Sequence, residues 1–314
     1  MRAFMLLAGF AAVVAIQPAH ADSKKSIALV LGVKGSPFYD ALACGAKAKA
    51  ASLGYALTVS APDQFDPTAQ TPVVDAVGAA TPAAAAIVPT DGQALMRPIK
   101  NLADHGIKIL TVDQTLVDPS FVETQIVTDA LVGGALAAKE MARLLDGKGK
   151  VFILAAPPGL KAQDDRITGF LAQIKDSPNV KVVGTDYVND DPQKAAEIVT
   201  SAISANPDLA GVFAFNDQAA IGAITGLKQA GATSKIKLIA YDAATAEVNA
   251  LRNGAISALI AQDPKQEGEL AIALADKALK GEKLPKVTDS ELVVVRAGDA
   301  AAANRYEYKA DCTL

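Results

Sequence analysis

The chain has 314 residues, of which 51% are hydrophobic and 20% charged, and it contains no tryptophan. Its formal net charge is −4 and its basic residues are scattered, which excludes the clustered positive charge that nucleic-acid binding requires. The length suffices for two medium-sized lobes with a core each, and the composition is typical of a compact α/β protein rather than a fibrous or disordered one.

The N-terminus has the pattern of a secretory signal peptide. Met1 and Arg2 precede an apolar run over residues 3–16, and Ala19-His20-Ala21 supplies the small residues of a cleavage site. The run is short for a membrane span, and a charged segment follows it, so an uncleaved membrane anchor is the less favoured alternative. We expect cleavage of residues 1–21, which leaves a soluble protein outside the cytoplasm.

Beyond this leader, short apolar runs alternate with longer amphipathic stretches. The first run covers residues 27–31, and a helix is expected from Pro37 to Gly54, because proline suits the first helical turn and glycine the position just past the end. Further strand-like runs are 56–60, 85–88, 108–112, 124–127, 150–154, 180–184, 211–215, 237–240 and 256–261. Helical segments between them include 129–145, 192–205, 217–230 and 265–280. This alternation predicts parallel sheets covered by helices on both faces, and the continuously apolar strands agree with it.

Polar side chains follow the predicted strands at their carboxyl ends, where open parallel sheets bind ligands. In chain order they are Thr90-Asp91, Asp113-Gln114, Asn216-Asp217, Asp242 and Gln262, and the aromatic pair Phe38-Tyr39 follows the first strand. Planar amides and carboxylates can pair with sugar hydroxyls, and aromatic rings can cover the C–H face of a sugar. The pattern therefore predicts a sugar-binding cleft at the strand ends.

Each of these residues also has a structural interpretation. Asp91, Asp129 and Asp217 precede helical stretches, so helix capping is the preferred interpretation for all three. Asp242 could cap a helix over residues 245–251, and a Phe-Tyr pair at a helix start is more often part of a core. It is the joint placement of these residues at the strand ends that indicates a ligand site.

The sequence offers little for catalysis or metal binding. Once the leader is removed, His105 is the only histidine, and with Gly106 it has the pattern of a helix C-terminus. There is no Gly-x-Ser-x-Gly elbow, and Gly32-Val33-Lys34-Gly35 lacks the spacing of a phosphate-binding loop. We expect no catalytic residue, no metal and no cofactor.

Two cysteines, Cys44 and Cys312, remain in the exported chain. An oxidising compartment permits a disulfide between them, which would tie the C-terminal tail to the first helix. Two buried free thiols are the alternative, and the sequence leaves both open.

Nearly the whole mature chain resembles the ribose-type (type I) periplasmic sugar-binding proteins, the ligand-capturing subunits of ABC importers. The motifs that carry the resemblance, in this order and spacing, are residues 27–30 with 36–39, 87–91, 110–113, Asp129 with Gly133-Gly134, 212–217 with Gly222-Ala223, Tyr241-Asp242 and 260–262. The resemblance implies two Rossmann-like lobes, each a parallel sheet flanked by helices, joined by a three-strand hinge. Residues 22–127 with 263–290 would form the N-terminal lobe, and 128–262 with 291–314 the C-terminal lobe, with the tail after residue 297 belonging either there or to the N-terminal lobe.

The resemblance also implies ligand contacts residue by residue. Phe38 and Tyr39 would stack on the sugar, and Asp113 would accept its hydroxyls from the first lobe. Asn216 and Asp242 would do so from the second lobe, and Gln262 would bond the ligand at the hinge.

Four positions depart from the ribose pattern. Ser36 replaces the usual asparagine, which implies a weaker or water-mediated contact, and Gln114 replaces an arginine. The second-lobe arginine falls near Asp164, with Arg166 two residues further on as its substitute, and the second-lobe aromatic residue falls near Asp190. This more acidic pocket implies another pentose or hexose, a polyol or an amine-bearing ligand in place of ribose.

The implied partners are the small-molecule ligand and the membrane subunits of an ABC permease, with the binding protein acting as a periplasmic monomer. A sensory role, in which the closed protein docks on a chemoreceptor, is compatible with transport. Sugar-responsive transcriptional regulators resemble the same pair of lobes, but they need a DNA-binding headpiece where this chain has its leader.

Overall fold

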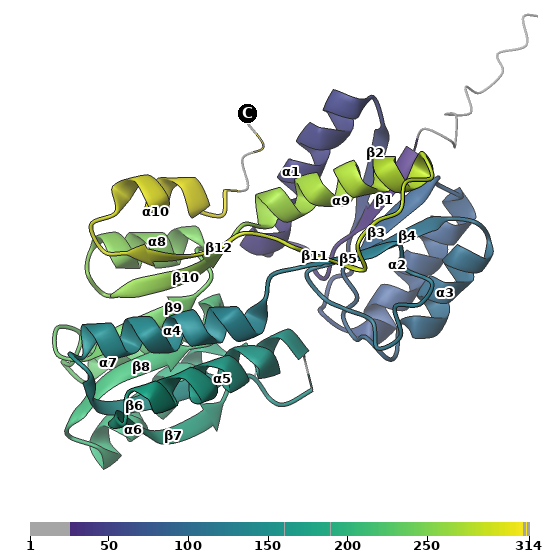
Figure 1. The fold of residues 1–314 in the computed structure, drawn as a ribbon. Coiled ribbons are helices and arrows are strands. Elements are labelled where there is room, and N and C mark those ends of the chain that lie inside the picture. The colour runs from purple at the N-terminus through teal and green to yellow at the C-terminus, as the bar shows by residue number, and fades with distance from the viewer. Residues whose placement is uncertain (1–25, 160, 189, 310–311, 313–314) are drawn as a thin grey trace, which may run out of the picture.

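The computed structural model describes residues 26–159, 161–188, 190–309 and 312, so the expected signal peptide lies outside the described residues. Within them the strands form two six-stranded sheets, one in each lobe (Figure 1). The first sheet is parallel throughout and has the order β11 (Val287–Asp289), β5 (Thr124–Val127), β4 (Lys108–Val112), β3 (Ala84–Ile87), β1 (Ser26–Val30), β2 (Ala56–Ser60).

The second sheet repeats this architecture with one difference at its edge. Its order is β12 (Leu292–Arg296), β10 (Ala258–Gln262), β9 (Lys237–Tyr241), β8 (Leu209–Ala214), β6 (Lys148–Ala155), β7 (Asn179–Tyr187). Five of these strands are parallel, whereas β12 runs antiparallel to β10 because the chain re-enters the lobe from the hinge. The predicted α/β class with helix-flanked parallel sheets is thus confirmed, apart from this strand.

Helices cover both faces of each sheet. In the first lobe, α1 (Pro37–Leu53) and α9 (Pro264–Leu279) pack on one face, and α2 (Pro67–Ala80) and α3 (Met96–Asp104) on the other. In the second lobe, α4 (Ala130–Leu144) and α5 (Lys161–Gln173) pack on one face; the opposite face is covered by α6 (Pro192–Ala205), α7 (Asp217–Gln229), α8 (Thr245–Arg252) and α10 (Ala300–Tyr306).

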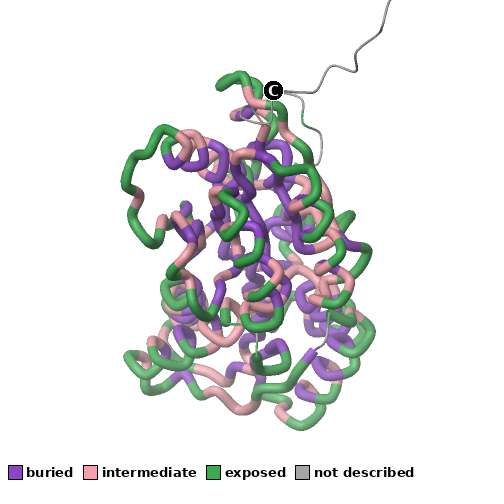
Figure 2. Tube along the Cα trace, turned by 90° about the vertical axis from the view of Figure 1, so that its right-hand side faces the viewer, coloured by how far each residue is buried: buried purple, intermediate pink, exposed green. Residues whose placement is uncertain are grey.

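The apolar strands divide their side chains between two cores. In β1, Ile27 and Leu29 point into the core under α1 and α9, whereas Ala28 and Val30 point into the core under α2 and α3. A strand alternates its side chains between the faces of the sheet, so a strand buried on both faces must be apolar throughout. Figure 2 shows buried segments running through the interior, with exposed positions on the outside of the molecule.

The local signals for α1 and for His105 are confirmed. α1 begins at Pro37 and is followed by Gly54 with φ 75°, and His105 ends α3, with its Nδ1 atom 2.6 Å from the carbonyl oxygen of Asn101. In the described part of the chain, none of the helices combines the length and the apolar character needed to cross a membrane.

The helices α1 and α9 lie side by side (Figure 1) because glycines allow their backbones to approach closely. A Cβ atom on Gly45 would lie 1.9 Å from the carbonyl oxygen of Lys265, and one on Gly268 would lie equally close to that of Leu42. Any larger side chain at these two positions would push the helices apart.

The chain passes between the sheets three times: from β5 to α4, from β10 to α9, and from β11 to β12. Glu267 of α9 links two of these hinge segments, since its Oε1 atom accepts hydrogen bonds from Thr128 (2.9 Å) and Ser290 (2.8 Å). At the third, Asp263 caps α9 and forms an ion pair with Arg305 of α10 at 2.6 Å.

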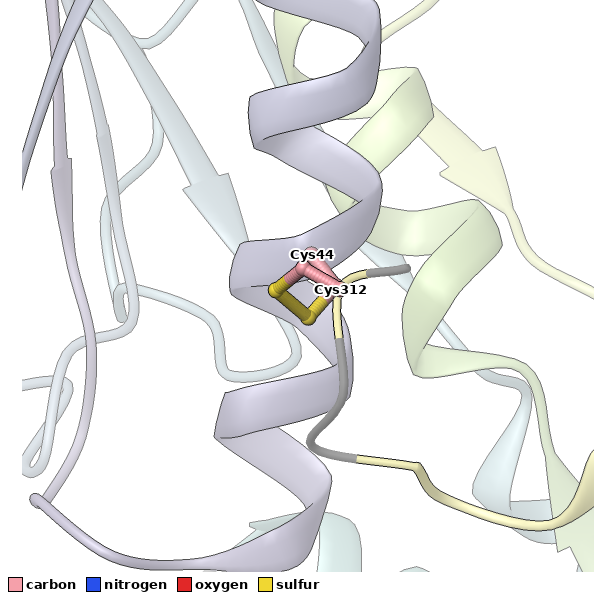
Figure 3. The surroundings of a disulfide bond; sticks show 2 residues. All are labelled: Cys44 and Cys312. Carbon is pink, nitrogen blue, oxygen red and sulfur yellow. A yellow bond between two sulfur atoms is a disulfide. The ribbon is translucent and has the colours of Figure 1, made fainter. Parts of the chain in front are cut away.

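A disulfide joins Cys44 to Cys312, with the two Cα atoms 4.9 Å apart (Figure 3). Of the two possibilities that the sequence left open, the structure therefore has the disulfide. It fastens the C-terminal tail, which follows α10 on the second lobe, to α1 of the first lobe.

Candidate ligand-binding cleft

The two lobes enclose a cavity of about 410 Å³ at the carboxyl ends of β1, β4, β8, β9 and β10. Ten of the eleven residues predicted from the sequence line it: Ser36, Phe38, Tyr39, Asp113, Gln114, Arg166, Asp190, Asn216, Asp242 and Gln262. It is also lined by residues for which the sequence predicted no ligand contact, among them Phe65, Gln163, Asp217 and Tyr308.

On the first-lobe wall, Asp113 is held in place by its neighbours. The Tyr39 hydroxyl donates to Asp113 Oδ2 at 2.9 Å, and Gln114 Nε2 donates to the same oxygen at 3.4 Å. Burial raises the pKa of Asp113 to about 6, although the hydrogen bond from Tyr39 acts in the opposite direction. Asp113 is thus a carboxylate whose charge a ligand hydroxyl would stabilise.

The aromatic residues of this wall are arranged differently from the expectation. Tyr39 is largely buried, and its ring lies parallel to that of Phe65, with the ring centres 6.4 Å apart. Phe38 meets the ring of Tyr39 edge-on at 5.3 Å and is only partly buried. Phe65 follows β2, so its position after a strand was the signal that could have identified it. The expected stacking pair, Phe38 and Tyr39, is therefore joined by a third ring.

On the second-lobe wall, Arg166 lies in the cleft and Asp164 does not. Asp164 is not among the residues that line the cavity, because its carboxylate turns back to accept a hydrogen bond from the N–H group of Gly159 at 3.0 Å. Gln163 and Arg166 are three residues apart on α5 and both face the cleft, as helical spacing requires. The assignment of Asp164 is thus corrected in favour of its neighbours.

Arg166 is almost completely buried and well supported. Its guanidinium lies 3.8 Å from the centre of the Tyr241 ring and donates to the carbonyl oxygen of Phe215 at 2.9 Å. Its Nε–H group has no hydrogen-bond partner among the described residues. A buried donor without a partner is costly, so an acceptor atom of a ligand would be bound favourably here.

Both residues after β8 line the cavity, but Asn216 rather than Asp217 is the helix cap. Asn216 caps α7, since its Oδ1 accepts from the N–H group of Ala219 at 3.0 Å, and its Nδ2 donates to Asp190 at 2.7 Å. Asp217, expected to be the cap, is the first residue of α7 and faces the cavity. The capping prediction was wrong by one residue because Asn216, not Asp217, has the extended backbone of a cap. The predicted cap at Asp129 is confirmed. The one at Asp91 was wrong, because Asp91 accepts from the N–H groups of Gln93 and Ala94 in a turn before α3, whose cap position is Leu95.

At the base of the cleft, Asp242 and Gln262 meet a residue from the C-terminal tail. Asp242 Oδ1 accepts hydrogen bonds from Gln262 Nε2 (2.7 Å) and from the Tyr308 hydroxyl (3.2 Å). Asp242 does not cap α8, whose cap is Ala244. No local pattern marks Tyr308, which lies 46 residues beyond Gln262 in the chain.

Asp113 and Asp242 share an unusual backbone. Both directly follow a strand and have positive φ, 63° for Asp113 and 89° for Asp242. Left-handed conformations strain residues other than glycine, and such strain is typically retained at functional sites. The strain turns both carboxylates into the same cleft from opposite lobes.

The family called periplasmic binding protein domain matches residues 27–283. The ribose import binding protein RbsB of Salmonella typhimurium is 30% identical over 284 residues, which cover 90% of this chain and 95% of that protein. The chain belongs to the ribose-type periplasmic sugar-binding proteins. An ABC transporter solute-binding protein from Agrobacterium vitis, solved with alpha-D-tagatopyranose, has a TM-score of 0.85 and 34% identity, covering 90% of this chain and 99% of that one. One from Actinobacillus succinogenes, solved with D-allose, has a TM-score of 0.83 and 26% identity, with the same shares covered.

In this periplasmic binding protein the cleft is acidic. The carboxylates of Asp113, Asp190, Asp217 and Asp242 line it, whereas the cations among the described lining residues are Arg166 and Lys34. Lys34 pairs with an aspartate at the rim. Burial, and then the charge of Asp242, raise the pKa of Asp217 to about 6. Such a cleft favours ligands that donate hydrogen bonds and disfavours anions.

Proposed function

We propose that this protein captures a sugar or polyol between its lobes in the periplasm and, as a monomer, delivers it to the membrane subunits of an ABC importer without catalysing a reaction. The observation that carries the proposal is the convergence of Asp113, Asp242 and Gln262, from the first lobe, the second lobe and the hinge, on one cleft with an aromatic wall. The sugars and import role in the names of its relatives support it.

The proposed ligand contacts follow from the chemistry of the cleft. Carboxylates from both lobes accept the hydroxyl hydrogens of the ligand, and the free Nε–H of Arg166 donates to one of its oxygens. Phe38 and Phe65 provide apolar surface for the C–H face of the ring. Asp164 takes no part in this assignment.

Closure of the lobes completes the site. The hydrogen-bonding groups lie on separate lobes, so one ligand satisfies both sets only when the hinge brings them together, as in other periplasmic binding proteins. Closing excludes water and strengthens each hydrogen bond in the cleft. The closed form would then be the form that the permease recognises.

The acidity of the cleft supports a second ligand class within the same function. Four carboxylates with one buried guanidinium leave an excess of negative charge, which an ammonium group on the ligand would neutralise. An amino sugar or an amine-bearing polyol therefore belongs in any ligand screen beside the neutral sugars.

A thermal-shift screen over D-ribose, D-tagatose, D-allose, D-arabinose, xylitol and amino sugars tests the proposal, because a ligand that binds only the folded state raises the melting temperature. No shift with any of these compounds would count against a sugar-binding role. The best ligand is then measured by calorimetry.

The decisive variant is Asp242→Asn, because asparagine tolerates the left-handed backbone at this position while it removes the charged acceptor. We expect its affinity to fall about 10- to 150-fold, the value of a hydrogen bond to a charged group. Asp75→Asn, on the exposed side of α2, is the matched control and should bind normally. Equal affinities for both variants would remove Asp242 from the site.

A further inference from the structure

The C-terminal tail crosses the hinge and is attached to both lobes. The Tyr308 N–H group donates to the carbonyl oxygen of Ala243 at 2.9 Å, and Tyr308 forms a parallel bridge with Ala244, so this residue is fixed to the second lobe. Four residues further on, Cys312 is bonded to Cys44 in α1 of the first lobe (Figure 3).

The side chain of Tyr308, the residue attached to the second lobe, lies in the ligand cleft. It is 3% exposed and lines both the cleft and a second cavity of about 590 Å³, which both cysteines also line. Its hydroxyl donates to Asp242 and accepts from the N–H group of Gln262 at 3.3 Å. Its ring meets Phe38 edge-on at 5.6 Å. Tyr308 thus touches the first lobe, the second lobe and the hinge.

We propose that Tyr308 is a positioning residue of the ligand site and that the Cys44–Cys312 disulfide holds it there. This inference rests on the proposed function and adds to it a site residue from the tail. The Tyr308 hydroxyl and Gln262 Nε2 both donate to Oδ1 of Asp242. This orients the carboxylate and leaves its other oxygen for a ligand hydroxyl.

The length of the tail makes the disulfide effective. Four residues of fully extended chain reach at most about 14 Å, so the bond to Cys44 limits how far α1 can move from Ala243. α1 also carries Phe38 near its N-terminal end, against which Tyr308 packs. The disulfide is therefore a fourth connection between the lobes, in addition to the three hinge segments.

Other contacts separate the effect of the disulfide from a general loss of the tail. Arg305 is paired with Asp263, and Arg252 with Glu307, so α10 stays attached to the hinge and to α8 when the disulfide is cut. The segment that loses its covalent tie begins after Tyr308, and Tyr308 then keeps only its noncovalent contacts, among them its hydrogen bonds to Ala243, Asp242 and Gln262. Cutting the bond should consequently loosen Tyr308 while the rest of the second lobe keeps its structure.

Hydrogen–deuterium exchange tests this without any ligand, on the full chain produced with its leader so that the disulfide forms during export. In the Cys44→Ser/Cys312→Ser variant we expect the amides of Gln262 and Tyr308 to exchange at least about fivefold faster, with α6 unchanged. In Tyr308→Phe, only the Gln262 amide should exchange faster, because it loses the Tyr308 hydroxyl as its acceptor. Tyr187→Phe, at an exposed position of β7, is the control. Unchanged exchange at both amides in the cysteine variant overturns the inference.

Calorimetry with the best ligand of the sugar panel, D-tagatose included, gives the functional readout. We expect Tyr308→Phe to lower affinity about tenfold, and the cysteine variant to do the same, with little further loss when the two are combined. A reductant should lower the affinity of the wild-type protein only. Full affinity in Tyr308→Phe refutes the positioning role. If no sugar binds the wild-type protein, the proposed function fails, while the exchange data still decide whether the disulfide holds Tyr308.

Discussion

Glu267 provides a quantitative test of how the hinge is held. Its side chain is completely buried, and its Oε1 atom accepts hydrogen bonds from Thr128 and Ser290 on two of the three hinge segments. Its Oε2 atom has no hydrogen-bond partner among the described residues, so a negative charge there would be poorly compensated. The perturbation that we consider is Glu267→Gln, which keeps the shape of the neutral side chain and cannot ionise.

Burial, and then the charge of Asp113, raise the pKa of Glu267 from 4.5 to about 8, and the two hydroxyl donors only partly oppose this. Between these two values the folded protein keeps a proton that the unfolded chain has lost. The stability associated with neutral Glu267 is thus fully present below pH 4.5 and is lost as the pH rises toward 8. The free energy of unfolding should fall by about 1.4 kcal/mol per pH unit, or about 5 kcal/mol over the whole interval.

Urea unfolding of the wild type and Glu267→Gln between pH 5 and 9 measures this effect. Asp113 and Asp217 titrate in both proteins, so the difference between the two free energies of unfolding reports Glu267 together with its interaction with Asp113. We expect the wild type to lose stability relative to the variant up to pH 8 and to follow it in parallel above. Glu197→Gln, on the exposed side of α6, should show no such slope. Parallel curves for the wild type and Glu267→Gln from pH 5 to 8 would refute the reasoning.

Two further predictions concern the ligand and the helix packing. The pKa values of Asp113 and Asp217 are raised to about 6, so sugar affinity measured by calorimetry should fall as the pH drops from 7.5 to 5, by up to about tenfold per pH unit for each carboxylate that must be charged. Asp113→Asn and Asp217→Asn should each flatten the profile, and a flat wild-type profile would contradict the assignment. Gly45→Ala should destabilise the protein by about 1–3 kcal/mol in urea unfolding, because the new methyl group meets the backbone of α9, whereas Lys47→Ala on the exposed side of α1 should not.

Local patterns predicted the strands, the main helices and the positions at strand ends that line the candidate cleft. Asp113, Asp242 and Gln262 were found because an apolar strand followed by a polar residue is visible in a few consecutive residues. The errors concern the choice between neighbouring residues that have similar chemistry or lie on the same helix. Asn216 and Asp217 can both cap a helix, and only the backbone conformation selects between them. Asp164 and Arg166 lie on one helix, and only its orientation shows which of them reaches the cleft.

The sequence by itself determined the alternation of buried strands and covering helices, the leader pattern and the family motifs, because each depends on residues that are neighbours in the chain. The tertiary structure alone decided that Cys44 and Cys312, 268 residues apart, are bonded, and that the Tyr308 hydroxyl donates a hydrogen bond to Asp242. It also decided which carboxyl groups have raised pKa values, among them Glu267. Hydrogen-bond partners and exclusion from water are properties of the three-dimensional surroundings of a side chain, and the chain's local pattern does not contain them.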